Sequence, residues 1–431
     1  MTTPPGAVDL LIVGAGAAGL FAAVWAGRTA AETGGQLTIR AVDGARKLGA
    51  KILVAGGGRC NVTHVEVHET DYAGGTPPAI RKVLRRFPVA DTIRFFAAAG
   101  VELKQEETGK LFPVTDSART VLEALMAEVR RTGVELLHPA RVTAVARHED
   151  GFLVTTSDGT TTARRVILCT GGRSLPKSGS DGGGYALAAG LGHSLTEPIV
   201  PALVPLVLEP GHWITSLSGL TLPTEVVLSA GDGRRLTATT GSTLCTHLGL
   251  SGPAILDISR HWLVARHRDA GVRLAVNWLP GVTPDEVERL FVAGQSRDPL
   301  VLLRERLPER LARSLCAAAA APPTGDLPRD ARRRLVAAVT ATPLPVTGDR
   351  GYAVAEATAG GVPLTEIRLE TMESRVCPGL HLAGELLDVD GRIGGFNFQW
   401  AWASGFIAGV AAVRGLTPTA RSGAGSPPAA P

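Results

Sequence analysis

The hydrophobic pattern near the N-terminus predicts a strand, a tight turn and a helix. Uncharged residues run from Leu10 to Gly27, but three glycines interrupt the apolar sequence. We therefore predict a buried strand at Val8–Val13 and a helix that begins near Ala17. The run is almost long enough to cross a bilayer. A signal peptide requires a basic residue ahead of its apolar segment, and none precedes this one. We therefore expect a cytoplasmic protein without membrane contact.

Alternation of apolar and polar residues predicts short strands in the middle of the chain. Residues 134–167 indicate one strand followed by an antiparallel meander. The meander ends in an apolar strand, Val166–Cys169, that leads into a Gly-Gly turn. A second apolar strand, Leu380–Ala383, precedes a glycine turn and an apolar helix that continues to about Val413.

The pattern changes twice between these blocks. Residues 198–283 indicate short strands and turns, as in a small β-barrel, and residues 284–342 show helical spacing. We expect an α/β protein whose pattern divides the chain into four parts before the tail, 1–197, 198–283, 284–342 and 343–414. The Pro, Ala, Gly and Ser content of residues 415–431 predicts a disordered tail.

Composition indicates a globular protein with more than one domain. The 431 residues exceed the size of a typical single core, and 45% hydrophobic with 19% charged residues excludes extended disorder. A formal net charge of +4 gives no reason to expect nucleic acid as a partner. The five cysteines are scattered, without a C-x-x-C pair or a His cluster at metal spacing. We therefore expect reduced thiols and no metal site.

The turn after the first strand has the spacing of a dinucleotide-binding motif. Gly14 permits the turn, Gly16 lets a pyrophosphate approach the backbone, and Gly19 lets the helix pack on the strand. The helix N-terminus supplies free N–H groups for phosphate. The strand in "QLTIRAVD" then ends at Asp43, where this fold places an acid that binds ribose hydroxyls.

Two later features favour FAD over NAD as the cofactor. The meander runs into Thr170-Gly171-Gly172, a junction typical of FAD-binding folds. The turn Gly394-Gly395-Phe396-Asn397 opens a helix whose N-terminus can stabilise the negative charge of a reduced flavin. The sequence holds no second unit of strand, G-x-G-x-x-G turn and helix. NAD(P)H as an electron donor would therefore bind transiently over the flavin.

Seven segments of the sequence are distinctive: "VGAGAAG", "GGGRCN", "CTGG", "GSDGGGYALAAGLGH", "THLGLSGPA", "GELLDVDG" and "GGFNFQWAWASG". They resemble segments of the BaiN-like flavoproteins, a family also known as aminoacetone oxidases or NAD(P)/FAD-dependent oxidoreductases, and the similarity extends from about Val8 to Arg414. The resemblance implies non-covalent FAD and a Rossmann-like FAD domain formed by two segments, 1–197 and 343–414, with a β-barrel-like insert at 198–283 and a helical insert at 284–342 between them. "CTGG" and "GSDG" are also similar to segments of fumarate reductase-like flavoenzymes. Those enzymes use an Arg as the catalytic acid, and that Arg has no identifiable counterpart here.

The resemblance places the segment "GGGRCN" along the flavin end of the cofactor. Its bare glycine N–H groups would approach phosphate or ring oxygens, Arg59 would supply charged donors, and Asn61 would pair in both directions. Lys51 fits a cofactor contact and a surface position equally well. Asp43 stands where a Glu is more common in the family. The expected cofactor-binding residues are Gly14, Gly16, Gly19, Asp43, Lys51, Gly56, Gly57, Gly58, Arg59, Cys60, Asn61, Thr170, Gly171, Gly172, Gly384, Glu385, Gly394, Gly395, Phe396 and Asn397.

No residue stands out as the catalytic acid or base. His247, in "CTHLGLSGPA", is suited to proton transfer, with backbone hydrogen bonding in the barrel as the alternative. Cys60 beside a flavin would be a redox-active thiol or, without a partner cysteine, a small packing residue. His193 is expected to be structural, and Tyr352 and Arg392 are weaker candidates for the flavin pocket.

These observations predict an FAD-dependent oxidoreductase that exchanges a hydride between flavin N5 and a small organic substrate. Either a substrate C–H is oxidised, with oxygen or a carrier as acceptor, or reduced flavin delivers hydride to an activated C=C, with NAD(P)H as donor. An RNA-modifying flavoprotein is an alternative that the Arg-rich stretch 297–334 leaves open. A flavin-binding module without catalysis is another.

Overall fold

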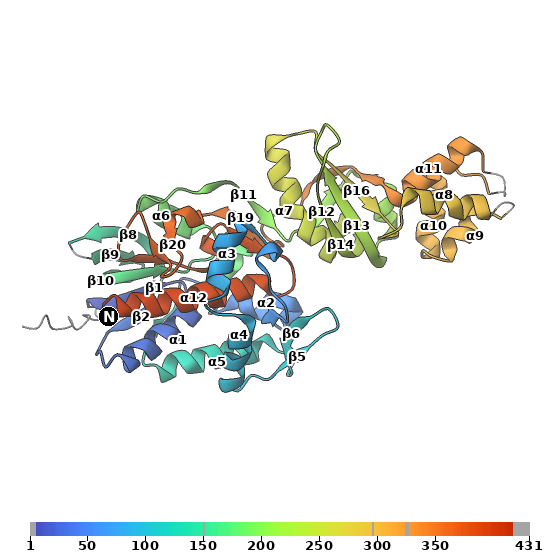
Figure 1. Cartoon of the computed structure of the whole chain (residues 1–431). Coiled ribbons are helices and arrows are strands. Elements are labelled where there is room, and N and C mark those ends of the chain that lie inside the picture. Colours follow the sequence, from blue (N-terminus) through green and yellow to red (C-terminus); the bar gives the residue numbers. More distant parts are fainter. Residues whose placement is uncertain (1–5, 150, 295–296, 324–326, 417–431) are drawn as a thin grey trace, which may run out of the picture.

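The protein has two lobes joined end to end (Figure 1). The computed structural model describes residues 6–149, 151–294, 297–323 and 327–416. Both ends of the described chain lie in the first lobe, and the residues between them build the second. Apart from its first two residues, the tail predicted at 415–431 lies outside the described residues.

A parallel sheet forms the centre of the first lobe, in the order β22-β10-β1-β2-β7. Its strands are β1 (Val8–Val13), β2 (Ile39–Val42), β7 (Glu135–Leu137), β10 (Gly159–Leu168) and β22 (Leu380–Leu382). The predicted meander is confirmed, because β8 and β9 continue from β10 as antiparallel strands. The remaining strands of this sheet are β8 (Val142–His148), β9 (Gly151–Thr156), β20 (Ile367–Arg368) and β21 (Glu373–Ser374).

Two helices from opposite ends of the chain pack side by side on this sheet (Figure 1). They are α1 (Ala17–Glu32), which begins where the sequence predicts, and α12 (Phe396–Arg414). A Cβ on Gly405 would lie 2.5 Å from the Ala18 carbonyl oxygen, and one on Gly409 would lie 2.4 Å from that of Ala22. These glycines therefore let the two backbones touch, which fixes both helix N-termini at one end of the sheet.

The other elements of the first lobe surround this centre. Its further helices are α2 (Ala50–Gly58), α3 (Pro77–Leu84), α4 (Val89–Ala98), α5 (Ala118–Arg131) and α6 (Gly183–Gly190). Its short strands are β3 (Thr63–His64), β4 (Tyr72–Gly74), β5 (Leu103–Gln105), β6 (Lys110–Pro113) and β23 (Val389–Gly391). A two-stranded link to the second lobe consists of β11 (Thr196–Ala202) and β19 (Ala357–Gly361).

The second lobe contains a curled antiparallel sheet of seven strands, in the order β17-β16-β13-β14-β15-β12-β18. They are β12 (Leu206–Leu208), β13 (Thr221–Ser229), β14 (Arg235–Thr246), β15 (Gly249–Ser251), β16 (Arg273–Asn277), β17 (Thr342–Leu344) and β18 (Val346–Asp349). Only Pro345 separates the two edge strands in the chain, so the sheet must curl until its edges meet. The far end of the lobe is helical, with α8 (Pro284–Ala293), α9 (Pro299–Arg304), α10 (Glu309–Ala318) and α11 (Arg329–Thr340).

Two expectations for the insert need correction. Residues 198–283 are not strands throughout, because Pro253–Arg268 form the long helix α7. Its buried residues Ile255, Ile258 and Trp262 recur at helical spacing, and Pro253 occupies the first helical turn. The boundary at residue 343 is also wrong, because β17 and β18 complete the insert sheet and the chain returns to the first lobe only at β19.

Separate hydrophobic cores fill the two lobes. A small third cluster lies at their junction and contains Ala202, Leu203, Leu256, Ala357 and Ala359. Among the described residues, no helix combines the length and the apolar character needed to cross a bilayer. The stretch from Leu10 to Gly27 is instead split between β1 and α1.

Candidate cofactor site

A cavity of about 620 Å³ opens at the carboxyl ends of the parallel strands. The turns after β1, β2, β10 and β22 all line it, with Gly14, Asp43, Thr170 and Gly384 respectively. In doubly wound sheets this edge forms a crevice, because connections leave neighbouring strands toward opposite faces. The volume lies within the range of small-molecule and cofactor sites.

A different physical reason explains why glycine occupies each of the three motif positions in the first turn. Gly14 has a φ of +94°, and a Cβ there would lie 2.4 Å from the Cys169 carbonyl oxygen. A Cβ on Gly19 would lie 1.8 Å from the Gly14 carbonyl oxygen, so this glycine lets α1 pack against the turn. Gly16 is different. Among the described residues, no atom other than those of its two chain neighbours lies within 4 Å of a Cβ built there, and Gly16 lines the cavity.

The carboxylate of Asp43 holds the first turn in place. One of its oxygens accepts a hydrogen bond from the Ala15 N–H and the other from the Ala45 N–H, both at 2.7 Å. At the same end of the cavity, Arg141 and Asp181 form an ion pair of 2.8 Å. The acid that the motif requires therefore lies at the cavity, where it also organises the backbone that would face a phosphate.

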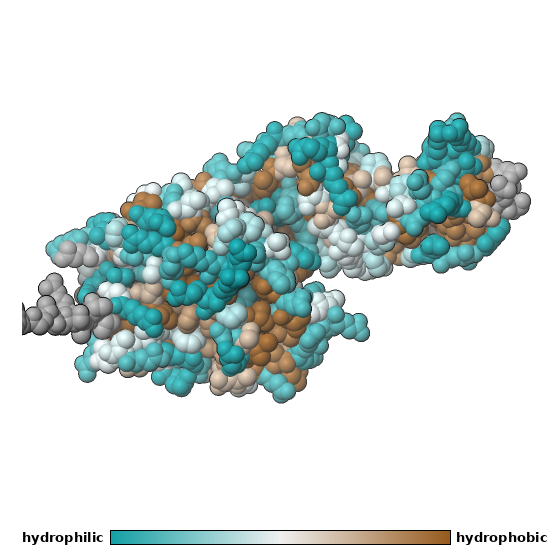
Figure 2. Space-filling view, in the orientation of Figure 1, coloured by the Kyte–Doolittle hydropathy of each residue, from teal (hydrophilic) through white to brown (hydrophobic). Residues whose placement is uncertain are grey.

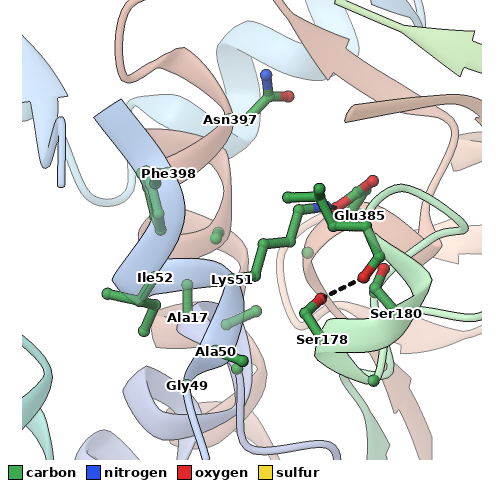
Figure 3. A pocket seen from close by; sticks show the side chains of 18 of the residues that line it. Ala17, Gly49, Ala50, Lys51, Ile52, Ser178, Ser180, Glu385, Asn397 and Phe398 are labelled. Atoms are coloured by element: carbon green, nitrogen blue, oxygen red, sulfur yellow. Dashed lines mark hydrogen bonds and ion pairs between the residues drawn. The ribbon is translucent and has the colours of Figure 1, made fainter. Parts of the chain in front are cut away.

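Lys51 reaches across the cavity toward Glu385 (Figure 3). Its ammonium group pairs with one Glu385 oxygen and lies 2.5 Å from the Ser174 hydroxyl. That hydroxyl also donates to the other Glu385 oxygen at 2.9 Å. Lys51 is therefore not a free surface residue. It belongs to a three-membered network that connects α2 with the turns after β10 and β22.

The glycines of "GGGRCN" adopt backbone conformations that other residues rarely take. Gly56, Gly57 and Gly58 have φ values of +57°, +69° and +88°, which break the helical path at the end of α2. Arg59 beside them is engaged within the protein. Its guanidinium pairs with Glu106 at 2.5 Å and lies over the Phe112 ring. Its contribution to the cavity is thus a positioned charge that is already partly neutralised.

Three polar side-chain atoms at the cavity are buried without a hydrogen-bond partner among the described residues. They are Asn61 Oδ1, Thr170 Oγ1 and Ser180 Oγ. An unpaired buried polar atom costs free energy, so such atoms are expected where a ligand completes the pairing. Together with the open space at Gly16 and the helix N-termini of α1 and α12 at the two ends of the cavity, they fit a phosphate-containing, hydrogen-bonding cofactor such as FAD.

The N-terminus of α12 closes the other end of the cavity. Gly395 precedes the helix with a φ of +96°, and a Cβ there would lie 2.6 Å from the Thr63 backbone. Asn397 fixes the preceding turn, because its amide accepts from the Gly391 N–H and donates to the Gly391 carbonyl. Within the part of the chain that the structure describes, no side chain caps this helix, so its first N–H groups remain available to an anionic ligand edge.

Most of the expected cofactor-binding residues line this one cavity. They are Gly14, Gly16, Asp43, Lys51, Gly56, Gly57, Arg59, Asn61, Thr170, Gly171, Gly384, Glu385, Gly394, Gly395 and Asn397. The other five expected residues do not line the cavity; they are Gly19, Gly58, Cys60, Gly172 and Phe396. The main-chain carbonyl of Phe396, for example, accepts a hydrogen bond from the Tyr72 hydroxyl.

The two suggested catalytic residues do not reach the cavity. His247 is exposed in the turn between β14 and β15, within the insert. Cys60 is completely buried behind the wall. Of the weaker candidates, Arg392 lines the cavity, whereas the Tyr352 hydroxyl donates to the Ile199 carbonyl and lies outside the lining.

Cys60 is expected to be chemically inert in the folded protein. Burial raises the pKa of its thiol far above the usual cysteine range, so the reactive thiolate is suppressed. Iodoacetamide at pH 8 should label Cys316, the one cysteine of the five that is not fully buried, before Cys60. Peptide mass spectrometry measures the order in which the two cysteines are labelled. Rapid labelling of Cys60 in the native protein would contradict this burial.

A Ser–His–Glu arrangement lies elsewhere in the first lobe. The Ser374 hydroxyl is 2.8 Å from His193 Nε2, and His193 Nδ1 is 2.6 Å from a Glu366 oxygen. These distances match a hydrolytic triad, but the His193 side chain has no exposed surface and Ser374 is buried. The serine oxygen also accepts the N–H groups of Val376 and Cys377. The arrangement is therefore structural.

We expect Ser374→Ala to lower the free energy of unfolding by about 1–3 kcal/mol, because it removes the acceptor of the buried Cys377 N–H and of the Val376 N–H. Urea unfolding measures the loss. Flavin binding should not change, because none of the three side chains lines the cavity. A fluorophosphonate probe should leave Ser374 unlabelled in the native protein. Labelling would show that the serine is accessible and reactive.

Sequence reasoning missed several residues that line the cavity. They are Lys110, Phe112, Arg141, Ser180, Asp181, Glu356 and Phe398. Ser180 and Asp181 lie in "GSDGGG", a segment already singled out by its glycines, so that signal was available. Lys110 and Glu356 carry no such signal, because each is an isolated charge in an ordinary sequence context.

The chain is similar to proteins of described function over nearly all of its length. The family described as HI0933-like protein Rossmann domain matches residues 8–411. The 3-dehydro-bile acid delta(4,6)-reductase of Clostridium scindens is 35% identical over 409 residues, which cover 93% of this chain and 98% of that protein. The ribosomal RNA dihydrouridine synthase of Escherichia coli is 33% identical over 404 residues, covering 92% and 96%.

A solved structure shows the same fold at low sequence identity. The FrdA chain of Escherichia coli quinol fumarate reductase aligns with a TM-score of 0.52 and 16% identity, over 98% of this chain and 72% of that one. The family match covers both segments of the first lobe and the insert between them. The chain therefore belongs to the HI0933-like Rossmann family, in agreement with the resemblance to BaiN-like flavoproteins, and is an FAD-dependent oxidoreductase.

Proposed function

We propose that the protein is a reductase that adds hydrogen across a carbon–carbon double bond conjugated to a carbonyl group. The observation that carries the proposal is the cavity at the strand ends, with open glycine backbone, two uncapped helix N-termini and unpaired polar atoms. The names of the relatives support the reaction class. A delta(4,6)-reductase of a 3-oxo steroid acid and a dihydrouridine synthase both saturate a C=C in conjugation with a carbonyl.

In this proposal the residues of the first lobe hold FAD along the cavity. The N-terminus of α1 at Gly16 faces the pyrophosphate, and Asp43 binds ribose hydroxyls. Lys51 and Glu385 line the stretch between the two helix N-termini, and the N-terminus of α12 stabilises negative charge on the reduced ring. When bound, the flavin supplies the hydride. The protein excludes water and orients the substrate against it.

We further propose that a nicotinamide nucleotide is the electron donor and that the substrate is a small molecule. The purified protein should be yellow, and anaerobic NADH or NADPH should bleach the flavin. A conjugated enone, such as a 3-oxo-Δ4 steroid, should then restore the colour. A flavin that neither nucleotide bleaches would favour an oxidase instead. A protein that cannot be loaded with FAD would contradict the assignment of the cavity.

Uridine in RNA is a second candidate substrate. Relatives from two bacteria, Escherichia coli and Haemophilus influenzae, are ribosomal RNA dihydrouridine synthases. In addition, Arg329 and Arg333 of α11 are exposed and have no ion pair among the described residues. Ribosomal RNA transcripts incubated with protein and NADPH, followed by nucleoside mass spectrometry, test this candidate. Dihydrouridine would identify RNA as the substrate, and passage through heparin at low salt would argue against it.

A further inference from the structure

Two charged side chains in the cavity have no direct partner. Lys110, at the start of β6, and Glu356, just before β19, both line it. Among the described residues, neither their ammonium group nor their carboxyl group forms a hydrogen bond or an ion pair within 4 Å. Glu356 is exposed to the cavity and Lys110 is half-buried.

Every other charged side chain of the described lining is already engaged. Lys51 pairs with Glu385, Arg59 with Glu106, Arg141 with Asp181, and Arg392 with Asp71, while Asp43 accepts two backbone N–H groups. A charged group that faces a cavity without a partner is available to a ligand. The two free groups are therefore the ones that the cavity presents to whatever enters it.

Both free groups lie at the end of the cavity where the lobes meet. The Lys110 Cε is 3.6 Å from the position of a Cβ on Gly394, beside the N-terminus of α12. The Glu356 backbone is pinned by its N–H, which donates to the Leu203 carbonyl at the junction. Its carbonyl accepts from the Ser174 hydroxyl at 3.3 Å. Glu356 thus projects into the cavity from a rigid position.

The surface around this end is apolar. Val54 and Val354 line the cavity and are 55% and 39% exposed, so their side chains present apolar surface to it. Figure 2 shows hydrophobic surface on the first lobe beside the recess between the lobes, in the region of α2. Such walls suit the carbon skeleton of a substrate, while Lys110 and Glu356 provide the polar contacts.

The protonation state of Glu356 follows from its surroundings. Although Glu356 is exposed to the cavity, the protein atoms around its carboxyl group desolvate that group, which raises its pKa, and Asp257 nearby raises it further. The ammonium groups of Lys110 and Lys51 lower it, but the balance remains above the usual glutamic acid value. Its proton is therefore retained to higher pH than on an exposed glutamic acid.

We propose that Glu356 is the proton donor to the substrate and that Lys110 binds the substrate carbonyl oxygen. This inference rests on the reductase function proposed above. A hydride, carrying two electrons from flavin reduced by a nicotinamide nucleotide, forms the new C–H bond at the β-carbon. The C=C electron pair moves to the α-carbon, which takes the Glu356 proton. Lys110 stabilises the negative charge that develops on oxygen, and water returns the proton to the carboxylate.

Glu356→Gln tests the proton donor in the FAD-loaded protein, with Glu107→Gln as the control. Glu107 is an exposed carboxylate close to Lys110 in the chain that does not line the cavity. In stopped flow, E356Q should be reduced by NADPH as fast as wild type. Reoxidation of its flavin by the enone should slow by about 10²–10³-fold, within the range of general acid catalysis. Added formic acid should partly restore this rate, and E107Q should match wild type in both steps.

A second measurement does not depend on activity. In the cofactor-free protein, the infrared difference between wild type and E356Q isolates the protonated carboxyl band of Glu356, which should titrate above the usual glutamic acid range. Reoxidation of E356Q at the wild-type rate would overturn the inference alone, as would a carboxyl that titrates normally. A wild-type flavin that is reduced by NADPH but reoxidised by no conjugated alkene would overturn the proposed function and this inference with it.

Discussion

Gly16→Ala should weaken FAD binding at least about tenfold, or about 1.4 kcal/mol, while the apoprotein remains as stable as wild type. Apart from its two chain neighbours, the added methyl group meets no atom of the described residues within 4 Å, so the substitution should not destabilise the fold. It enters the cavity at the N-terminus of α1, where the pyrophosphate would approach the backbone. Titration of the apoprotein with FAD, followed by flavin fluorescence, gives the affinity, and thermal unfolding gives the stability.

Gly19→Ala is the matched comparison, three residues along the same motif. Its methyl group would lie 1.8 Å from the Gly14 carbonyl oxygen, a clash with backbone that no rotamer change relieves. Overpacking of this kind costs about 1–3 kcal/mol or more, so the apoprotein itself should unfold earlier. If both variants bound FAD like wild type, the cavity would not be the dinucleotide site. If G16A unfolded as early as G19A, the space at Gly16 would not be free.

Arg260→Met should destabilise the folded protein by about 3–5 kcal/mol at pH 8, because it leaves a buried carboxylate without its cation. Arg260 lies on α7 of the second lobe and Asp390 on β23 of the first, and the Asp390 side chain is 3% exposed. The guanidinium contacts both carboxylate oxygens, at 2.9 and 3.0 Å. Urea unfolding of wild type and variant measures the difference.

The loss of unfolding free energy in Arg260→Met should depend on pH, because it depends on the protonation state of Asp390. Burial raises the pKa of Asp390 to about 6, even though Arg260 acts to lower it. Since the folded pKa exceeds that of the unfolded chain, protonation of Asp390 stabilises the fold below about pH 4. This contribution is lost as the pH rises through 6. Without Arg260 the pKa rises further, so the deficit of the variant should be small at pH 4 and grow toward pH 8.

Two control variants separate this effect from a general loss of packing. Adding Asp390→Asn to Arg260→Met removes the charge and should recover much of the stability at pH 8. Arg235→Met breaks an exposed ion pair with Glu225 and should cost less than about 1 kcal/mol. An R260M deficit that does not vary between pH 4 and pH 8 would contradict a role for buried charge.

Local sequence patterns were sufficient to predict the strand, the helix and the acidic residue that begin the site. The strand Val8–Val13, the start of α1 at Ala17 and the acid at Asp43 follow from spacing alone. The reason is that a turn with positive φ, a free helix N-terminus and a buried apolar strand each need particular residues at short intervals. The same local reasoning failed at α7, because its short apolar segment after Gly252 fits a strand as well as a helix.

These local patterns could not predict contacts between segments that are far apart in the sequence. Lys51 and Glu385 are 334 positions apart and meet only because α2 and the turn after β22 face one cavity. Cys60 and His247 have chemically attractive side chains, yet one is buried behind the wall and the other is exposed in the insert. Which side chain faces a cavity depends on packing from several elements at once, and no single segment encodes it.

The sequence by itself determined the dinucleotide-type turn and the changes between strand and helix patterns along the chain, because dihedral limits and burial periodicity act over a few residues. The split Rossmann-like domain with an inserted lobe was predicted from the resemblance to a known family. Only the tertiary structure decided which charges remain free in the cavity. That outcome depends on which charged groups come close in space: among the described residues, Arg59 and Lys51 form ion pairs, whereas Lys110 and Glu356 do not.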